Sequence, residues 1–261
     1  MIHPTAVVSS KSHISQNVKV GPYCIIDDNV YIDQNTELIS HVHITGNTKI
    51  GKNNKFFPFS SIGTIPQDMK YSGEPSKLLI GDNNTFREGV TVNPGTQAGG
   101  MITKIENNCL FMIGSHIAHD CHISSNVIMS NNASLAGHVR ISDWAILGGF
   151  VLVKQFCNIG RHTYAGMGSQ INKDIPDYMV AAGINPKIRS INTVGLKRRG
   201  FSTSSISAIK RAFKVVYRDS QGRLLDQALK ELETSESDSP EVMQFVECIR
   251  NSRVGIMSGP N

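Results

Sequence analysis

An apolar residue recurs at every sixth position along most of the first 171 residues. A helix repeats near every 3.6 residues and a strand every two, so a strict period of six fits neither alone. It is typical of hexapeptide repeats, in which three hexads form one triangular coil of a parallel β-helix. Residues eighteen apart then lie on adjacent coils, roughly 4.8 Å from each other. The repeated positions are Ile2, Val8, Ile14, Val20, Ile26, Ile32, Leu38, Ile44, Ile50, Phe56 and Ile62, then Ile105, Phe111, Ile117, Ile123, Met129, Leu135, Ile141, Leu147, Val153, Ile159, Ala165 and Ile171.

Two interruptions of the period predict loops that project from the coils, at residues 63–79 and 94–104. An insertion in a solenoid leaves as a loop on one face, and such loops often carry function. The period ends after Ile171, and Pro176 and Pro186 mark the transition. We therefore expect a β-helix of about eight to nine coils over residues 1–186.

The remaining residues, 187–261, have helical periodicity and are expected to form a small domain that covers the open end of the β-helix. The expected helices are a short one in SINTVGLKRRG, then 202–218, 224–233 and 239–252, with SESDS as a linker. Ser239 is a good N-cap and Pro240 suits the first turn. The fold class is thus mainly β with an α-helical C-terminal part.

Composition excludes several classes of protein. No apolar run reaches the length of a membrane span, and the N-terminus lacks the features of a signal peptide, so we expect a cytoplasmic protein without an integral membrane segment. The five cysteines are widely spaced and form no CxxC, which favours reduced thiols. The net charge of +5 suits acidic partners, but no nucleic-acid reading motif accompanies it, so we expect no nucleic-acid partner.

The segment IGSHIAHDCHI contains the richest set of reactive side chains. Its histidines are His116, His119 and His122, and the coil repeat places His119 in one column with Gly137 and Gln155 and beside His138. A neutral imidazole there could take a proton from a hydroxyl, with Asp120 orienting it and the Gly137 amide donating to an oxyanion. The alternative is a polar face of solvated histidines.

Zinc is the competing chemistry, because the gamma class of carbonic anhydrases is also a histidine-rich β-helix. Those enzymes pair two histidines five residues apart with a third on another coil. Here Cys121 follows His116 at that distance, and His119, His122 and His138 have no histidine five residues away. We therefore expect no metal site.

Two further segments carry charge that suits a phosphorylated sugar. Asp68 and Lys70 lie two apart in the first expected loop, and Lys197, Arg198 and Arg199 follow one another near the end of the short helix. An acid and a base can hold a sugar hydroxyl and a phosphate, and consecutive cations can hold a diphosphate, although such charges are more often simply solvated. The chain has neither a P-loop nor a dinucleotide GxGxxG motif.

Five separated motifs resemble those of the UDP-N-acetylglucosamine acyltransferases of lipid A biosynthesis. They are IAHDC, NNASLAGHV, GG followed by KQFC, QDMKYSGEP and GLKRRGF, and they span essentially the whole chain. The resemblance implies a left-handed β-helix and a homotrimer with active sites between subunits. It also implies transfer of an (R)-3-hydroxyacyl group from acyl carrier protein to the glucosamine 3-hydroxyl of UDP-N-acetylglucosamine. The acyl group is carried on the phosphopantetheine of that protein, so no further cofactor is expected.

The resemblance also assigns roles to residues. His119 is the general base, Asp120 its partner and Gly137 the oxyanion donor. Positions that match contacts to sugar, phosphate or acyl chain are Asp68, Lys70, His116, His138 and Gln155. Positions that match the surroundings of the nucleotide or the phosphopantetheine arm are Asn192, Arg198 and Arg199. The basic C-terminal helices suit an acidic carrier protein.

Three positions depart from the family pattern. Asn93 and Pro94 stand where the family usually has His-Arg, and Lys154 stands where histidine is usual. Met167 occupies the position that measures the acyl chain, which is often glycine in members that take long chains. A bulky thioether there predicts a shorter hydroxyacyl donor.

Other functions remain open from sequence alone. A paralogue that acylates the amine of a 3-amino UDP-sugar would use the same base and oxyanion donor. A catalytically inactive solenoid that binds a UDP-sugar would explain Asn93 and Lys154. Acetyl-CoA-dependent hexapeptide transferases match less well, because their C-terminal helices and QDMKY-type loop differ. The sequence leaves the acyl length, the acceptor atom and the stability of the trimer undetermined.

Overall fold

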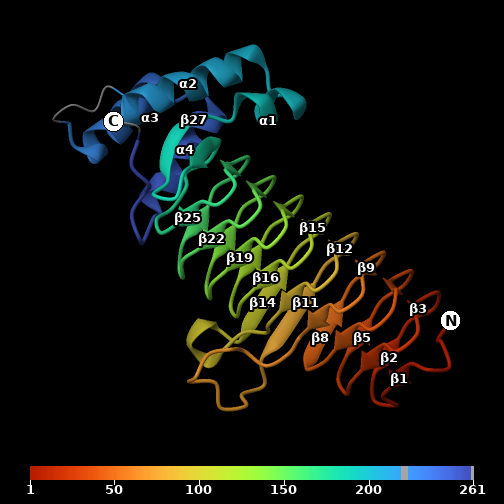
Figure 1. Cartoon of the computed structure of the whole chain (residues 1–261). Helices are drawn as coiled ribbons and strands as arrows, with labels where there is room; N and C mark the ends of the chain where they lie inside the picture. The colour runs from red at the N-terminus through yellow and green to blue at the C-terminus, as the bar shows by residue number, and fades with distance from the viewer. Residues whose placement is uncertain (219–222, 260–261) are drawn as a thin grey trace.

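The computed structural model describes residues 1–218 and 223–259. Within these ranges the hexapeptide repeats form three flat, mainly parallel sheets of nine, eight and ten strands, which enclose a triangular core. Each coil contributes one strand to each sheet, and strands eighteen residues apart pair in register, as Ile117 does with Leu135. Figure 1 shows the coils stacked from the N-terminus to the helices at the other end. The predicted parallel β-helix is confirmed.

The first sheet contains β1 (Val7–Val8), β4 (Ile25–Ile26), β7 (His43–Ile44), β10 (Ser61–Ile62), β13 (Thr91–Val92), β16 (His116–Ile117), β19 (Ser134–Leu135), β22 (Leu152–Val153) and β25 (Gln170–Ile171). The second contains β2 (His13–Ile14), β5 (Tyr31–Ile32), β8 (Asn47–Ile50), β11 (Lys77–Ile80), β14 (Ile102–Ile105), β17 (His122–Ile123), β20 (Arg140–Ile141) and β23 (Asn158–Ile159). The third contains β3 (Lys19–Val20), β6 (Glu37–Leu38), β9 (Lys55–Phe56), β12 (Thr85–Phe86), β15 (Leu110–Phe111), β18 (Ile128–Met129), β21 (Ile146–Leu147), β24 (Tyr164–Ala165), β26 (Met179–Ala182) and β27 (Lys187–Ile191).

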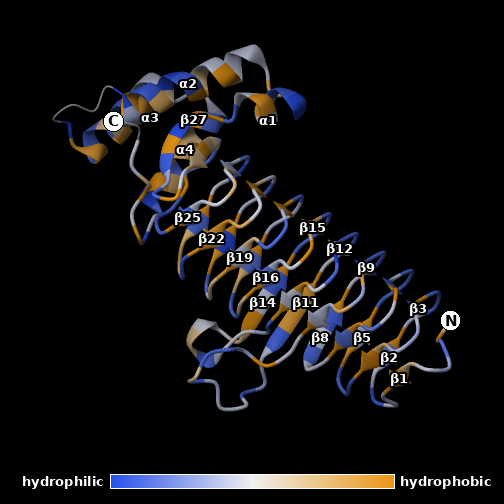
Figure 2. Ribbon diagram, viewed as in Figure 1, coloured by the Kyte–Doolittle hydropathy of each residue, from blue (hydrophilic) through white to orange (hydrophobic). Residues whose placement is uncertain are grey.

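The core is filled by the apolar residue of each hexad. Hydrophobic and hydrophilic residues alternate around the coils in Figure 2. Phe56, Phe86 and Phe111 lie on successive coils of the third sheet, and their rings stack with centroids 4.7 and 4.9 Å apart. Burial of such rings and their stacking stabilise the coils that bracket the two insertions.

The corners of the coils require a left-handed backbone conformation. At one corner this conformation is adopted by asparagines, which tolerate positive φ because their short polar side chains cost little there. These residues are Asn17, Asn35, Asn53, Asn83, Asn108 and Asn126, with φ between +56° and +62°. At the corner between the first and second sheets the same conformation is adopted by Asp120 and His138, with φ of +59° and +63°.

The two expected loops are shorter than predicted. Lys77 to Leu79 already belong to β11, and residues 102–104 belong to β14. In both strands a second buried residue precedes the repeated one by two positions, Leu78 before Ile80 in β11 and Thr103 before Ile105 in β14. A strand of four residues points two side chains into the core, because successive side chains alternate between its faces. The period of six therefore does not predict these longer strands.

The C-terminal helices are α1 (Thr193–Arg198), α2 (Thr203–Tyr217), α3 (Leu225–Ser235) and α4 (Pro240–Arg250), close to the expected ranges, and η1 (Gln97–Gly99) is a short 3₁₀ turn in the second loop. The Ser239 side chain accepts the Val242 N–H and caps α4, with Pro240 at its first turn. Strand β27 was not predicted and pairs antiparallel with β26. Residues beyond the expected division at 186 therefore extend the third sheet, and the division itself stays a prediction.

None of the helices within the described part of the chain is long and apolar enough to cross a membrane.

Candidate active site

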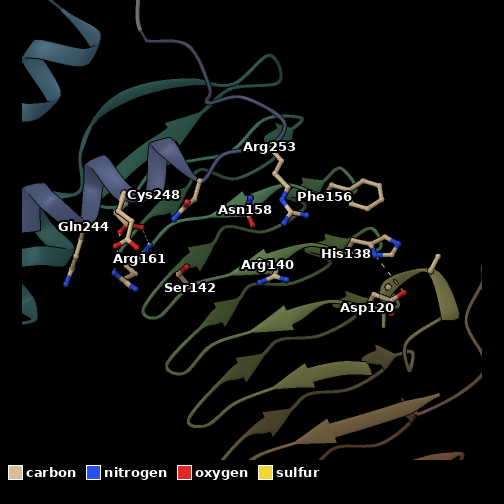
Figure 3. A pocket seen from close by; sticks show the side chains of 15 residues that line it. Asp120, His138, Arg140, Ser142, Phe156, Asn158, Arg161, Gln244, Cys248 and Arg253 are labelled. Carbon is tan, nitrogen blue, oxygen red and sulfur yellow. Dashed lines mark hydrogen bonds and ion pairs between the residues drawn. The ribbon is translucent and has the colours of Figure 1, made fainter. Parts of the chain in front are cut away.

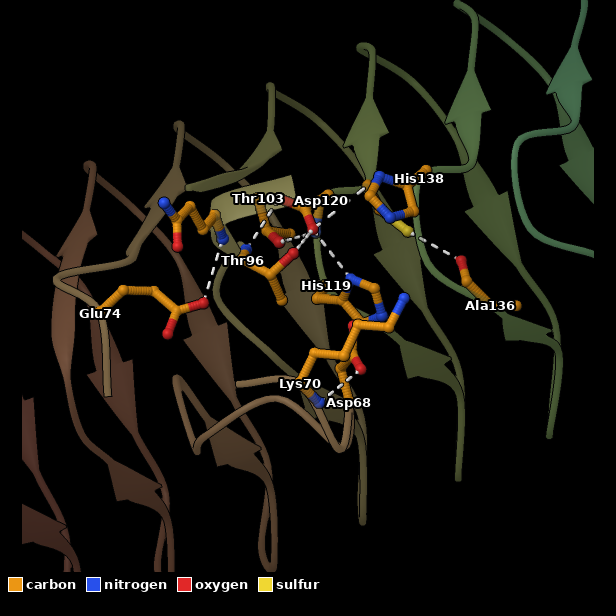
Figure 4. A network of polar contacts seen from close by, with 11 residues as sticks. Asp68, Lys70, Glu74, Thr96, Thr103, His119, Asp120, Ala136 and His138 are labelled. Atoms are coloured by element: carbon orange, nitrogen blue, oxygen red, sulfur yellow. Dashed lines mark hydrogen bonds and ion pairs between the residues drawn. The ribbon is translucent and has the colours of Figure 1, made fainter. Parts of the chain in front are cut away.

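The corner between β16 and β17 holds His119 and Asp120, and the next coil brings Gly137 and His138 beside them. His119 is buried, and its Nδ1 lies 2.8 Å from Asp120 Oδ2. The sequence predicts that these four residues lie together. Figure 4 shows His119, Asp120 and His138 side by side, and Gly137 lies against the His119 ring. The arrangement is a histidine–carboxylate pair at a corner of the coils.

Asp120 is held by the second loop, a contact that sequence reasoning missed. Its Oδ1 accepts the Thr96 backbone N–H at 2.9 Å, and its Oδ2 accepts the Thr96 hydroxyl at 2.6 Å. The Asp120 N–H donates to Thr103 Oγ1 at 2.8 Å. These bonds fix the direction of the carboxylate. The carboxylate in turn accepts a hydrogen bond from the N–H at His119 Nδ1, which leaves Nε2 unprotonated and able to act as a base.

Gly137 allows the imidazole to lie close to the backbone of the next coil. A Cβ at Gly137 would lie 2.4 Å from His119 Cε1 and 2.6 Å from Nε2. No described residue accepts a hydrogen bond from the Gly137 N–H. This amide is therefore available as a donor close to the basic nitrogen of His119, which is the requirement for stabilising an oxyanion there.

His138 closes the other side of the pair. Its ring meets His119 edge-on at 5.1 Å between centroids and stacks on Phe156 at 4.4 Å, while its Nδ1 lies 3.9 Å from Asp120 Oδ2. Burial is the largest effect on the pKa of His138 and lowers it, although Asp120 and Asp68 oppose the shift. His138 is therefore a neutral hydrogen-bonding group at neutral pH.

His116 lies on β16, two residues before the corner. Its Nδ1 is 2.7 Å from Thr91 Oγ1 on the preceding coil. Burial lowers the pKa of His116, and the charge of a protonated His119 would lower it further. His116 is thus also kept neutral. Of the three histidines, His119 alone is hydrogen-bonded to a carboxylate, and His138 lies further from the same one, at 3.9 Å.

The first loop brings Asp68 and Lys70 to the same site, where Figure 4 shows both next to His119. The Lys70 N–H donates to Asp68 Oδ1 at 2.9 Å. The loop is anchored by Asn93, whose Nδ2 donates to Thr64 O at 2.9 Å and to Ile65 O at 3.2 Å. Asn93 is buried, and its side chain is hydrogen-bonded to the backbone at the start of the first loop. This is the role, in this chain, of the residue that departs from the expected family pattern.

Gln155 lies on the coil next to Gly137, where the Phe156 N–H donates to Gly137 O at 3.3 Å, and the Gln155 side chain is exposed. The other expected site residues have different surroundings, and Met167 is 78% exposed. Asn192 is buried and caps α1, where its Oδ1 accepts the Gly195 N–H at 3.0 Å. Arg198 is exposed, and Arg199 lies over the Trp144 ring at 5.2 Å from its centroid. Within one chain the structure does not bring this second group to the histidine–carboxylate pair.

A cavity of about 690 Å³ opens beside the pair and runs along the second sheet to α4 (Figure 3). Asp120 and His138 form one end of it, and Gln244 and Cys248 of α4 form the other. The cavity is lined mainly by polar and charged side chains, which suits a hydrophilic ligand rather than an alkyl chain.

Comparisons with known proteins agree on one family. The family described as UDP-N-acetylglucosamine O-acyltransferase, domain 2, matches residues 174–257. An acyl-[acyl-carrier-protein]–UDP-N-acetylglucosamine O-acyltransferase of Janthinobacterium is 46% identical over 250 residues, which are 96% of this chain and 95% of that protein. This chain belongs to the UDP-N-acetylglucosamine O-acyltransferase family. The relative of the same name from Stutzerimonas stutzeri is 43% identical and matches 98% of each chain.

Solved structures of the UDP-N-acetylglucosamine O-acyltransferase family have the same fold. The UDP-N-acetylglucosamine acyltransferase of Francisella novicida superposes with a TM-score of 0.96 at 40% identity, over 100% of this chain and 95% of its own. The enzyme of Bacteroides fragilis also gives 0.96 at 40% identity, over 98% and 100%. The expected left-handed β-helix is thereby confirmed.

The possibility of a metal needs a separate test in this acyltransferase family member. Ligand atoms of His119, Asp120 and His138 lie within 4.8 Å of one another, in a cluster that spans two coils and contains no pair of histidines five residues apart. Both Asp120 oxygens, however, already accept hydrogen bonds from Thr96, and one also accepts from His119. The residues therefore fit an orienting carboxylate better than a metal ligand.

Proposed function

We propose that this chain transfers an (R)-3-hydroxyacyl group from acyl carrier protein to the glucosamine 3-hydroxyl of UDP-N-acetylglucosamine, the first step of lipid A biosynthesis. The observation that carries the proposal is the His119–Asp120 pair with the Gly137 amide beside it. The relatives that match nearly the whole chain carry the name of this activity. Asn93 and Lys154 differ from the expected family pattern, which left an inactive UDP-sugar-binding protein as an alternative. Neither residue belongs to the His119–Asp120 pair.

The reaction starts with His119. Nε2 takes the proton of the sugar hydroxyl as its oxygen attacks the thioester carbonyl carbon, and Asp120 stabilises the imidazolium that forms. The Gly137 N–H donates to the oxyanion of the tetrahedral intermediate. When the C–S bond breaks, the leaving thiolate takes the proton back from Nε2, so His119 is restored and the products are an ester and a thiol.

Substrate positioning follows from the same corner. Asp68 and Lys70 on the first loop, next to His119, would hold sugar and phosphate, and the neutral His116 and His138 would hydrogen-bond neutral substrate groups. Gln155 lies one coil further along the column. These contacts would orient the 3-hydroxyl toward His119.

Asn192, Arg198 and Arg199 fit the proposal only if a second subunit supplies them. We expect a homotrimer in which the α1 region of one subunit faces the His119 corner of its neighbour, and in which Met167 ends the acyl groove between subunits. The exposure of Met167 in the single chain supports a surface that another subunit covers. The donor's phosphopantetheine is the prosthetic group of its carrier protein, and the cytoplasmic location stays a prediction.

The test is mass analysis of the product formed from UDP-N-acetylglucosamine and a panel of (R)-3-hydroxyacyl carrier proteins. We expect one added hydroxyacyl group, on oxygen, and a fall in kcat of about 10²–10⁴ for His119→Ala. His122→Ala is the matched control, because His122 lies three residues away on the second sheet and its Nε2 faces Glu106 at 3.4 Å. Exclusive acylation of the 3-amino analogue, or turnover that survives His119→Ala, would contradict the proposal.

A further inference from the structure

The cavity beside the active site contains basic groups that the mechanism does not use. Arg140, Arg161 and Arg253 line it, together with Asn158. Arg161 has an acidic neighbour, since its guanidinium is 3.8 Å from Asp177. Among the described residues, neither Arg140 nor Arg253 forms an ion pair. Two guanidinium groups without an ion pair therefore line one cavity that ends at the catalytic corner, where Asp120 is held by Thr96 and His119.

Arg140 reaches the cavity because of its place in the coil. It follows His138 by two residues and begins β20, where its side chain points outward from the second sheet (Figure 3). Its neighbours in register are His122 on one coil and Asn158 on the next. Neither neighbour is an acid, so its charge is left for a ligand.

Arg253 belongs to the C-terminal segment, which folds back over the same sheet. Asp174, which is buried, holds this segment in place. Asp174 Oδ2 accepts the Ser252 hydroxyl at 2.7 Å and the Asn158 side-chain N–H at 3.0 Å, and its backbone N–H donates to Gly255 O at 3.0 Å. The buried carboxylate thus joins the segment that carries Arg253 to the coil next to Arg140. In Figure 3 Arg253 hangs beside Asn158, and Arg140 lies on the neighbouring coil, so both arginines line the cavity.

The chemistry of this cavity fits a phosphate group. Arginine presents several N–H donors in a planar fork that matches phosphate oxygens, and two unpaired arginines can hold one phosphodiester from two sides. Phe156 and His138 stack at the catalytic end, so a narrow organic arm could lie against them. At the α4 end Asp177 and Glu247 add negative charge, which places the preferred phosphate position near Arg140 and Arg253.

We propose that Arg140 and Arg253 form a subsite for the phosphodiester of the phosphopantetheine arm that carries the acyl group. The inference rests on the proposed function, in which Asp68 and Lys70 hold the sugar nucleotide on the loop side of His119. The cavity leaves the corner on the side of His138, so it is the free route for the second substrate. Its polar lining suits the amides of pantetheine and excludes the acyl chain, which must leave the corner by another path.

The experiment measures binding to the full-length protein rather than turnover alone. The probes are phosphopantetheine, pantetheine without the phosphate, and UDP, each titrated against wild type, Arg140→Ala, Arg253→Ala and Arg140→Lys. We expect phosphopantetheine to bind wild type more tightly than pantetheine, and each alanine variant to lose about tenfold in phosphopantetheine affinity, a size typical of an exposed charge-assisted contact. Pantetheine and UDP affinities should stay unchanged, and Arg140→Lys should lose less than Arg140→Ala.

Lys11→Ala is the matched control for charge. Lys11 pairs with Asp28 near the other end of the β-helix, so its loss changes the net charge by the same amount away from the cavity. The inference is overturned if the phosphate adds nothing to wild-type binding, if the arginine variants bind phosphopantetheine as wild type does, or if they lose UDP affinity instead. Acyl transfer by wild type is assayed in parallel. Arginine-dependent binding without any transfer would support the subsite while contradicting the proposed function.

Discussion

At the scale of single residues, the site depends on a glycine as much as on its histidine. His119 and Asp120 are the proposed base and its partner, and the imidazole can only lie where it does because Gly137 has no side chain. Close approach of a side chain to backbone on an adjacent coil is a frequent reason for glycine in a strand or turn. From the sequence, the coil repeat predicts that Gly137 and His119 are neighbours in space. It does not predict how closely the His119 ring approaches the Gly137 backbone.

The variant Gly137→Ala tests this contact. The new methyl group would lie 2.4 Å from His119 Cε1, so the imidazole must move away from the oxyanion position. We expect kcat to fall about 10²–10³-fold with little change in the KM for the sugar nucleotide. Gly149→Ala is the control, because the nearest atom to its added Cβ is Asn131 O at 3.4 Å. Equal activity of the two variants would show that the His119–Gly137 approach is unimportant.

A second residue-scale prediction concerns Asp177, which lies under α4. Burial raises the pKa of Asp177 to about 6, although the Arg161 N–H, at 2.7 Å, and the Arg161 charge oppose the shift. Because the folded-state pKa lies above the unfolded one, the folded chain holds the proton more tightly. This stabilisation is present below about pH 4 and is lost as the pH rises to about 6.

Asp177→Asn removes the buried charge and keeps an acceptor for the Arg161 N–H. We expect the variant to gain stability over wild type between pH 4 and pH 6, by up to about 3 kcal/mol per chain at higher pH. Melting temperatures of both proteins from pH 4 to pH 8 would measure the gain. A difference that does not vary with pH would mean that Asp177 is ionised throughout this range.

At the scale of elements, the two insertions do what the regular coils cannot. The second loop carries Thr96, which orients Asp120, and the first carries Asp68 and Lys70 to His119. Each loop is held by side chains of the coils, since Asn93 bonds to Thr64 and Ile65 at the base of the first. In this β-helix the coils carry His119, Asp120 and Gly137, and the two inserted loops carry the proposed substrate contacts and the residue that holds Asp120.

Asn93→Ala should loosen the first loop. Loss of its two hydrogen bonds, to Thr64 O and Ile65 O, should make trypsin cleavage after Lys70 about thirtyfold faster, because each bond contributes about 1 kcal/mol to the closed loop. Fragment masses over time would follow the cleavage, and Asn131→Ala, with an exposed side chain, is the control. Unchanged cleavage after Lys70 would mean that other contacts hold the loop.

At the scale of the whole molecule, one chain brings the proposed base His119 together with only some of the expected substrate contacts. Arg198 and Arg199 lie with α1 at the helical end, away from His119. A homotrimer with sites between subunits would bring the two groups together.

Mixed trimers test that arrangement. Each of His119→Ala and Arg198→Ala should be nearly inactive alone, whereas subunits of the two variants that are unfolded and refolded together should regain part of the wild-type activity. The reason is that some clefts would then combine an intact His119 from one subunit with an intact Arg198 from another. Sedimentation would establish the trimer, and mixtures that stay inactive would place both groups in one subunit's site.

Met167 belongs to this scale too, because its proposed role needs a groove between subunits. Met167→Gly should lengthen the groove and shift the preference toward longer hydroxyacyl donors, roughly tenfold for two added carbons, since each buried CH₂ contributes about 0.8 kcal/mol. Competition between donors of different length would measure the shift. Ile184→Gly, which trims another exposed apolar side chain, is the control. An unchanged preference would refute the assignment.

The sequence by itself determined the β-helix, its columns and the neighbourhood of His119, Gly137 and His138, because a period of six converts spacing directly into contacts between coils. Only the tertiary structure decided which side chains from outside the repeat reach the candidate active site and its cavity. Thr96 reaches Asp120 from a loop outside the period, and Arg253 reaches the coil of Arg140 from a segment that folds back from α4. Such contacts depend on the path of irregular chain, which no repeat describes.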